Sequence, residues 1–308
     1  MSTSSDIQQW HVKEPYVDLH CGLGEGPYYE AATKTLRFVD IKKKQLHTVS
    51  VTDGPASLVT LQLDERPTVT ANIAGVDPQQ TLLVGLKYGI ARLDRRTGRY
   101  EYLSRFAPAG QDDNARLRAN DGAADPHGRF WLGTMTDFDL GEFQPEGSLY
   151  LFPTPSTVPP VPIRTALTIP NSIGWSPDHR TMYFTHSSAR TVFAVAYDPA
   201  TGALGAERVF YVHDGPGEPD GFRVDVEGNL WHAVYGEAAV LKISPEGRVV
   251  GRVNLPTRNA TCVEFVGGEL FVTTAGDEEG EGESKRYGGG LFRVDVGGRG
   301  VGHFEVKL

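Results

Sequence analysis

Residues 116–135 read RLRANDGAADPHGRFWLGTM and contain the unit on which the rest of the chain is built. A polar pair, Asn120 and Asp121, stands directly before a glycine and a short strand-like run. The turn sequence DPHG follows at 125–128, and a second strand-like run covers 130–135. Because Pro presets φ and Gly accepts a positive φ, the pattern predicts two antiparallel strands joined by a tight turn.

The same unit can be laid over five other parts of the chain. In each, a polar residue precedes a strand-like run, a turn follows, and an apolar strand leaves the turn. The second strands of the six units begin at Leu36, Leu82, Phe130, Met182, Leu230 and Leu270. The repeat length is therefore about 40 to 52 residues, the range of propeller blades with four strands each. We predict an all-β fold, a six-bladed β-propeller with four antiparallel strands per blade, in which residues 1–308 form a single domain.

A ring of sheets has to join its two ends, and an N-terminal strand added to the last blade is the simplest joint. Residues 8–19 form such a strand-like run before the first unit begins. We predict that it pairs in the last blade, beside strands at 290–296 and 303–306. Two stretches fit no blade: 107–115, expected to be an exposed loop, and 276–290, expected to be a mobile, solvated acidic loop.

The balance of charge limits the partners of the chain. There are 30 Lys and Arg against 39 Asp and Glu, a formal net charge of −9. A nucleic-acid backbone and an anionic membrane surface both require a basic patch, so we expect neither as a partner. There is no run of 18 apolar residues, and residues 1–6 show neither a basic region nor an apolar core. We therefore expect a cytoplasmic protein.

The chain has two cysteines, Cys21 and Cys262. Two are too few for a disulfide framework, and each lies in a strand-like context. We expect both to be buried free thiols.

The polar residue before each first strand suggests a shared site. Equivalent positions of different repeats lie at one height around the axis, so these side chains are expected to converge on one mouth of the central channel. The positions are Glu25, Asn72, Asn120, Asp121, Asn171, Asp220, Thr261 and Cys262. Asn and Asp before Gly are also ordinary turn residues, but Glu25 is a poor turn former. An all-oxygen cage of this kind favours a hard divalent cation such as Ca²⁺, Mg²⁺ or Mn²⁺.

Five motifs together resemble those of a known family. They are LGEGP at 23–27, RANDG at 118–122, GTM at 133–135, PNSIGW at 170–175 and PDG at 219–221. In order and spacing they are similar to the SMP-30/gluconolactonase/LRE-like family, which includes regucalcin and sugar lactonases. The resemblance implies a six-bladed propeller that binds one catalytic divalent cation and hydrolyses a sugar lactone to the aldonic acid.

The resemblance also implies roles for individual residues. Glu25, Asn171 and Asp220 would bind the cation, with Asp220 also the general base. Arg118 and Asn120 would hold substrate oxygens, and the residues around this set would be Asp121, Asn72 and His186. Ca²⁺ is the expected cation, with Mg²⁺, Mn²⁺ and Zn²⁺ as alternatives. The cation would polarise the lactone carbonyl while the base takes a proton from water.

Two positions depart from the family pattern. Regucalcin-type members carry acidic residues shortly after GTM, and one of these contacts the substrate. Here the run at 136–139 is TDFD, which puts Phe138 at the contacting position. His186 stands before Ser187 where relatives usually have Asp. The identity of the lactone therefore stays open.

Other classes of function were compared with this one. The sequence has no Gly-x-Ser-x-Gly elbow, His-Glu-x-x-His pair or phosphate-binding loop. A metal-dependent propeller hydrolase of phosphoesters or fluorophosphates would use the same cage. A non-catalytic calcium-binding propeller would need the cage but no base. The sequence does not determine the oligomeric state.

Overall fold

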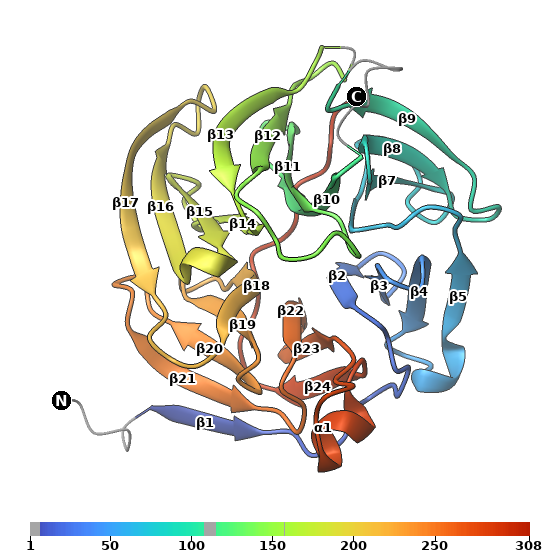
Figure 1. Ribbon diagram of the computed structural model, residues 1–308, viewed down its shortest axis with the longest axis vertical. Coiled ribbons are helices and arrows are strands. Elements are labelled where there is room, and N and C mark those ends of the chain that lie inside the picture. The colour runs from blue at the N-terminus through green and yellow to red at the C-terminus, as the bar shows by residue number, and fades with distance from the viewer. Residues whose placement is uncertain (1–6, 108–114, 157) are drawn as a thin grey trace.

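The computed structural model describes residues 7–107, 115–156 and 158–308. Within these residues the strands form six sheets in a ring, the predicted six-bladed propeller (Figure 1). Blade 1 contains β2 (Gly24–Glu30), β3 (Thr35–Asp40), β4 (Gln45–Ser50) and β5 (Val59–Gln62). Blade 2 contains β6 (Val69–Ala71), β7 (Thr81–Leu86), β8 (Gly89–Asp94) and β9 (Tyr100–Arg105). Blade 3 contains β10 (Leu117–Ala124), β11 (Phe130–Thr136), β12 (Gly147–Phe152) and β13 (Val161–Leu167). Blade 4 contains β14 (Pro170–Trp175), β15 (Thr181–His186), β16 (Thr191–Tyr197) and β17 (Leu204–Val212). Blade 5 contains β18 (Glu218–Val224), β19 (Leu230–Tyr235), β20 (Ala239–Ile243) and β21 (Val249–Asn254). Blade 6 contains β22 (Ala260–Val266), β23 (Glu269–Thr274) and β24 (Leu291–Asp295).

Helical structure is short in the described residues. Besides the 3-10 turns η1 (Pro55–Ser57) and η2 (Ser187–Ala189), there is the helix α1 (Gly282–Tyr287). None of these is long and apolar enough to cross a membrane. Because α1 lies inside 276–290, and Asp277 there is buried and bonded to Arg258 at 2.6 Å, this segment is more ordered than predicted. The loop predicted at 107–115 lies almost entirely outside the described residues.

The N-terminal segment closes the sixth blade, as predicted. Val17 forms an antiparallel bridge with Leu291 of β24, through N···O distances of 3.1 and 2.9 Å. The regular strand β1 (Gln8–His11) goes further around the ring and runs parallel to β21. The fifth sheet therefore has five strands, in the order β1-β21-β20-β19-β18. One segment thus ties the fifth blade to the sixth.

The prediction that 303–306 adds a strand to the last blade is wrong. Val17 pairs with Leu291 at the outer edge of β24, and the described residues show no bridge between 303–306 and β24. The C-terminal strap, residues 300–307, instead crosses the middle of the ring toward β10 (Figure 1). Val306 forms a parallel bridge with Ile73, and the Lys307 amide donates to the Gly128 carbonyl at 2.8 Å.

Apolar side chains fill the space between neighbouring blades. β11, with the sequence FWLGTMT, is buried at every residue because both of its faces pack on other sheets. Trp131, Trp175 and Phe184 belong to one cluster that joins blades 3 and 4. The alternating pattern of a half-exposed sheet is therefore absent from this strand.

The turn residues Asp125 and Asp225 each accept a hydrogen bond from a tryptophan side chain as well as from the turn backbone. One oxygen of Asp125 accepts two backbone amides of its own turn, at 2.9 and 3.0 Å. The other accepts the indole N–H of Trp131 at 3.1 Å. Asp225 repeats the contact with Trp231 at 2.9 Å. These bonds satisfy two buried carboxylates and two buried indoles, so the repeated Asp and Trp are one structural unit.

A β-bulge interrupts the first strand of five blades at the same level. The register shifts occur in β2, β10, β14, β18 and β22, whereas β6 pairs with β7 without a shift. A bulge bends the strand and re-aims a side chain. Three of these bulges carry Glu25, Asn171 and Asp220. The site residues therefore stand where the strand regularity is broken.

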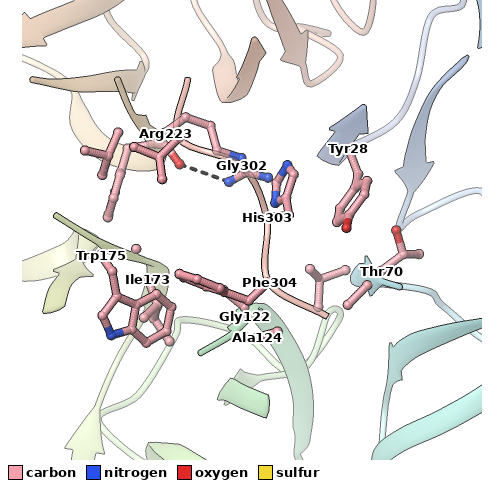
Figure 2. Close-up of a pocket in the computed structure, with 17 residues that line it drawn as sticks. Tyr28, Thr70, Gly122, Ala124, Ile173, Trp175, Arg223, Gly302, His303 and Phe304 are labelled. Atoms are coloured by element: carbon pink, nitrogen blue, oxygen red, sulfur yellow. Dashed lines mark hydrogen bonds between the residues drawn. The ribbon is translucent and has the colours of Figure 1, made fainter. Parts of the chain in front are cut away.

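The two ends of the first strands differ. At their starts lies an open cavity, which we call the site end. At their finishes, which we call the strap end, the C-terminal strap lines two cavities, one of about 70 Å³ (Figure 2) and one of about 380 Å³ beside the turn between β2 and β3. There His303 stacks on Tyr28 with ring centroids 3.9 Å apart, and Phe304 meets the edge of Trp175 at 5.9 Å. The strap thus fills this end of the axis with side chains.

Candidate functional site

The cavity at the site end has a volume of about 260 Å³. Residues from five of the six blades line it, and they include the polar residues Glu25, Arg118, Asn120, Asn171 and Asp220. These are the five residues that the sequence analysis assigned to cation and substrate. The fold thus gathers in one pocket side chains that are up to 195 positions apart in the chain (25 to 220).

The three expected cation ligands are buried and close together. Glu25, Asn171 and Asp220 are each less than one-tenth exposed. The Asn171 amide donates to an Asp220 oxygen at 2.5 Å, and its own oxygen accepts from the Ser172 amide at 2.9 Å. One oxygen of Glu25 accepts from the Gly26 amide at 3.1 Å. Within the described chain, the hydrogen-bond partners of both carboxylates are thus electrically neutral.

The electrostatics of the pocket follow from this burial. Burial raises the pKa of the Glu25 carboxyl well above its ordinary value, and the charges of Asp220 and Asp121 raise it further. Burial also raises the pKa of Asp220, and the hydrogen bond from Asn171 offsets only part of the effect. Buried carboxylates need a positive partner to stay ionised. Two carboxylates and an amide oxygen are a donor set that a hard divalent cation fits.

Asp121 forms a link beneath the pocket. Its oxygens accept from the Gly122 amide at 2.7 Å and the Ser172 hydroxyl at 2.6 Å. That hydroxyl in turn accepts from the Phe222 amide at 3.0 Å. The link connects blades 3, 4 and 5, and it passes through Ser172, the residue directly after Asn171. Asp121 thus fixes the backbone that carries a proposed ligand.

Arg118 and Asn120 form a pair on the pocket wall. An Nη1 hydrogen of Arg118 is donated to the Asn120 side-chain oxygen at 2.9 Å, and the Asn120 amide donates to the Pro170 carbonyl at 3.0 Å. Burial lowers the pKa of Arg118 to about 10, so the guanidinium remains charged at neutral pH. Its buried Nε has no hydrogen-bond partner in the described chain. This leaves a donor beside the pocket.

Phe138 lies on the pocket wall, where the family alignment puts the substrate-contacting position. The Arg118 guanidinium carbon lies 4.3 Å from the Phe138 ring centroid, and that of Arg66 lies 4.9 Å away. Asp137, the neighbouring acid, forms ion pairs with Arg66 at 3.1 Å and with Lys87 at 2.5 Å. The Asp137 carboxylate is therefore already neutralised, and the wall facing the pocket at Phe138 is aromatic.

The structure does not bring Asn72 into this pocket. In blade 1, Glu25 pairs with Val39, which lies three positions after Leu36 at the start of the second strand. In blade 2, the residue three positions after Leu82 is Gly85, and it pairs with Val69. Val69 is therefore the equivalent of Glu25. Asn72 lies three residues beyond Val69, roughly 10 Å along the strand. Its oxygen accepts from an Arg37 guanidinium N–H at 3.0 Å, near the strap end. The alignment of this unit was off by three residues because the connection between β6 and β7, residues 72–80, is longer than its counterparts, such as 125–129 between β10 and β11.

His186 also lies outside the pocket lining. Its Nε2 is 3.1 Å from the Thr168 amide, which donates to it, and 3.1 Å from the Ser188 hydroxyl. Burial lowers its pKa, so it is neutral at neutral pH. The next residue, Ser187, does line the pocket and accepts from Asn171 at 3.1 Å.

Several lining residues escaped the sequence analysis. They are Leu23, Lys42, Met135, Phe143, Ile169, Ser187, Glu218, Pro219, Tyr235 and Ala275. Most come from loops between strands, which carry no repeat signal. Glu218 and Pro219 could have been found, since they stand directly before Asp220.

Comparisons with known proteins agree with this architecture. Residues 23–299 match the family described as SMP-30/Gluconolactonase/LRE-like region. Pentonolactonase XacC of Haloferax volcanii is 35% identical, over 95% of this chain and 98% of its own. L-arabinolactonase of Azospirillum brasilense is 34% identical, over 82% of this chain and 81% of its own. The crystal structure of regucalcin, a calcium-binding protein from Agrobacterium tumefaciens, superposes with a TM-score of 0.86 at 26% identity, over 98% and 99% of the two chains. The chain belongs to the SMP-30/gluconolactonase/LRE-like family.

Proposed function

We propose that the protein is a metal-dependent lactonase that hydrolyses a sugar lactone to the aldonic acid. The observation that carries the proposal is the group of buried carboxylates with neutral partners in a sugar-sized pocket. The names of the relatives, a pentonolactonase and an L-arabinolactonase, support the same substrate class.

Glu25, Asn171 and Asp220 would hold one divalent cation. When bound, this cation supplies a positive charge that polarises the lactone carbonyl. Oxygen donors alone favour a hard ion, so we propose Ca²⁺, with Mg²⁺, Mn²⁺ and Zn²⁺ as alternatives to be tested. The named calcium-binding relative supports this choice.

Asp220 acts as the general base. One of its oxygens stays free of the cation and takes a proton from the water that attacks the carbonyl carbon. The ring C–O bond then breaks, and the departing ring oxygen takes up that proton to become a hydroxyl. The product is an open-chain acid. Because the raised pKa of Asp220 would otherwise favour its protonated form, the basic form depends on a positive charge nearby.

Arg118 and Asn120 orient the sugar. The unpartnered Nε of Arg118 is available to a substrate oxygen, and the Asn120 contact to Pro170 holds the pair in place. The Phe138 ring makes its side of the pocket apolar. We therefore propose that lactones with fewer or differently placed hydroxyls are preferred over those that regucalcin-type enzymes accept.

A screen of aldonolactones with a pH indicator tests the proposal. The protein is stripped with a chelator, and single divalent cations are then returned. We expect no turnover without a cation and restored turnover with one. Hydrolysis of phosphoesters but no lactone would favour the other hydrolase class. Tight cation binding with no turnover of either class would make the protein a binding propeller.

A further inference from the structure

A second group of metal-ligating side chains lies away from the pocket. Cys21, Asp40 and His47 are each no more than 2% exposed, and one ligand atom from each lies within 4.8 Å of the other two. The Cys21 sulfur is 3.9 Å from His47 Nε2. Two ligand atoms on one tetrahedral zinc ion lie roughly 3.5 Å apart. The side chains therefore need only a small adjustment to share a cation.

The contacts around the group orient its ligands. His47 Nδ1 is 2.9 Å from the Thr60 hydroxyl, which leaves Nε2 to face the sulfur. Such a contact on the second ring nitrogen is common for metal-binding histidines. Asp40 accepts from the Leu23 and Lys43 amides through one oxygen but from a single amide, that of Gly22, through the other, at 2.8 Å. That second oxygen keeps a lone pair for a cation.

The position of the group gives a cation a structural task. Cys21 belongs to the N-terminal segment that closes blade 6, and its amide donates to the Gly289 carbonyl at 2.9 Å. Asp40 and His47 belong to β3 and β4 of blade 1. A cation held by all three would therefore join the last blade to the first, at the seam where the ring closes.

An open cavity adjoins this seam at Cys21. A cavity of about 720 Å³, lined in part by Cys21, Gly22 and Lys43, lies beside the group. It offers an entry path and room for a water as a fourth ligand.

We propose that Cys21, Asp40 and His47 bind a thiolate-preferring divalent cation, Zn²⁺ or a similar ion, that staples the closure of the propeller ring. The ligand set has sulfur and imidazole, which separates it from the all-oxygen set of Glu25, Asn171 and Asp220. On uptake the Cys21 thiol gives up its proton to solvent, and the sulfur binds the cation as a thiolate. The proposal does not depend on lactone hydrolysis.

Cobalt titration of the chelator-stripped protein tests the site. Co²⁺ bound to a thiolate gives a sulfur-to-metal charge-transfer band, whereas Co²⁺ in an oxygen cage does not. We expect such a band in the wild type, saturating at one equivalent, and its loss in both Cys21→Ser and His47→Gln. Cys262→Ser, which alters the other buried thiol, should keep the band and serves as the matched control. Wild-type protein that binds Co²⁺ without the band, or a band that survives Cys21→Ser, overturns the proposal.

Thermal unfolding gives an independent measurement of how far a cation bound by Cys21, Asp40 and His47 stabilises the fold. At a hundredfold excess over Kd, Zn²⁺ should raise the Tm of the wild type on the order of 5 °C above its effect on Cys21→Ser. If Cys21→Ser does not fold, His47→Gln takes its place in the comparison. An equal rise in the wild type and in these variants would show that Zn²⁺ acts through the oxygen cage alone, which contradicts the staple.

Discussion

Both ends of the propeller axis bury carboxylates, but Glu25 and Asp220 at the site end lack the ion pairs that Glu30 has at the strap end. At the strap end, Glu30 is paired with Arg37 at 2.6 Å and with Arg95 at 2.7 Å. At the site end, the hydrogen-bond partners of Glu25 and Asp220 in the described chain are neutral amides. Glu30 is thus a buried carboxylate with ion pairs, whereas Glu25 and Asp220 are buried carboxylates without one in the described chain.

A second pair at the strap end shows what this difference means. Burial alone would raise the pKa of Glu264, but His303 at 2.6 Å and Arg223 at 3.2 Å bring it below its ordinary value. Glu25 has no ion pair in the described chain, and although the charge of Arg118 lowers its pKa, burial and the charges of Asp220 and Asp121 keep that pKa raised. An unpaired buried charge is costly, whereas a paired one can be tolerated. A buried acid that the protein leaves unpaired therefore indicates where an external cation belongs.

The largest effect is expected from Asp220→Asn, which keeps the size and an oxygen but removes the charge and the basicity. Loss of a general base typically costs about 10²- to 10⁴-fold in rate. We expect at least that loss in kcat at saturating cation, with the fold unchanged by circular dichroism. Recovery of near wild-type turnover at saturating cation would make Asp220 a ligand only.

The same acid-to-amide change at each end should alter stability in opposite directions. Glu30→Gln leaves the fully buried Arg37 without one of its partners, and the free energy of unfolding should fall by about 3 kcal/mol. Glu25→Gln in chelator removes an acid that has no ion pair in the described chain and whose charged form burial disfavours, so the free energy of unfolding should stay level or rise. Urea unfolding measures both variants. A loss of similar size in the two would mean that Glu25 has a cationic partner.

Asn171→Ala should weaken cation binding without removing the base. It deletes one neutral ligand, so we expect an affinity loss of roughly 10- to 100-fold, in the range seen when contacts around a metal site are removed. Excess cation should restore most of the turnover, in contrast to Asp220→Asn. Calorimetric titration with Ca²⁺ and turnover at rising Ca²⁺ give the two values. Failure of rescue would assign Asn171 a part in the reaction itself.

The stability of the metal-free protein should fall as the pH rises. The folded pKa values of Glu25 and Asp220 are raised, so above the ordinary carboxyl values near 4 the folded state binds more protons than the unfolded state. Each carboxyl then contributes a loss of up to about 1.4 kcal/mol per pH unit until the pH passes its raised pKa. Unfolding curves from pH 4 upward, in chelator and in Ca²⁺, measure this slope. Ca²⁺ should abolish it, and an equal slope in both conditions would argue against cation binding by these groups.

Phe138→Glu should give the smallest effect, a change in the ranking of lactones of a few-fold rather than a loss of activity. The change puts an acid where the ring now faces the pocket, so lactones with more hydroxyls should gain. Relative kcat/KM values across an aldonolactone panel measure the shift, with Ca²⁺ affinity as the control. A fixed ranking with collapsed affinity would show that Phe138 acts on the cation site instead.

The sequence alone was sufficient for the blade count and for five polar residues of the pocket: Glu25, Arg118, Asn120, Asn171 and Asp220. Turn residues and apolar strands recur every few dozen residues, and each unit can bury its faces only against like units, so the periodicity implies the ring. The repeat also aligns Glu25, Asn171 and Asp220, because their strands share the same bulge. Asn72 was misplaced because the connection between β6 and β7 is longer than in the other blades, and counting back from the second strand does not show where the first strand ends.

Other features were decided only by the tertiary structure. The C-terminal strap has the composition of a strand, but it crosses the axis and bridges to Ile73 instead of adding to β24. Which buried acids find arginines depends on neighbours from distant blades, as with Glu30 and Arg95, 65 residues apart. The sequence by itself therefore determined what repeats along the chain. The unpaired state of the acids at the site end and the closure of the strap end came from long-range contacts, which depend on how the whole ring closes.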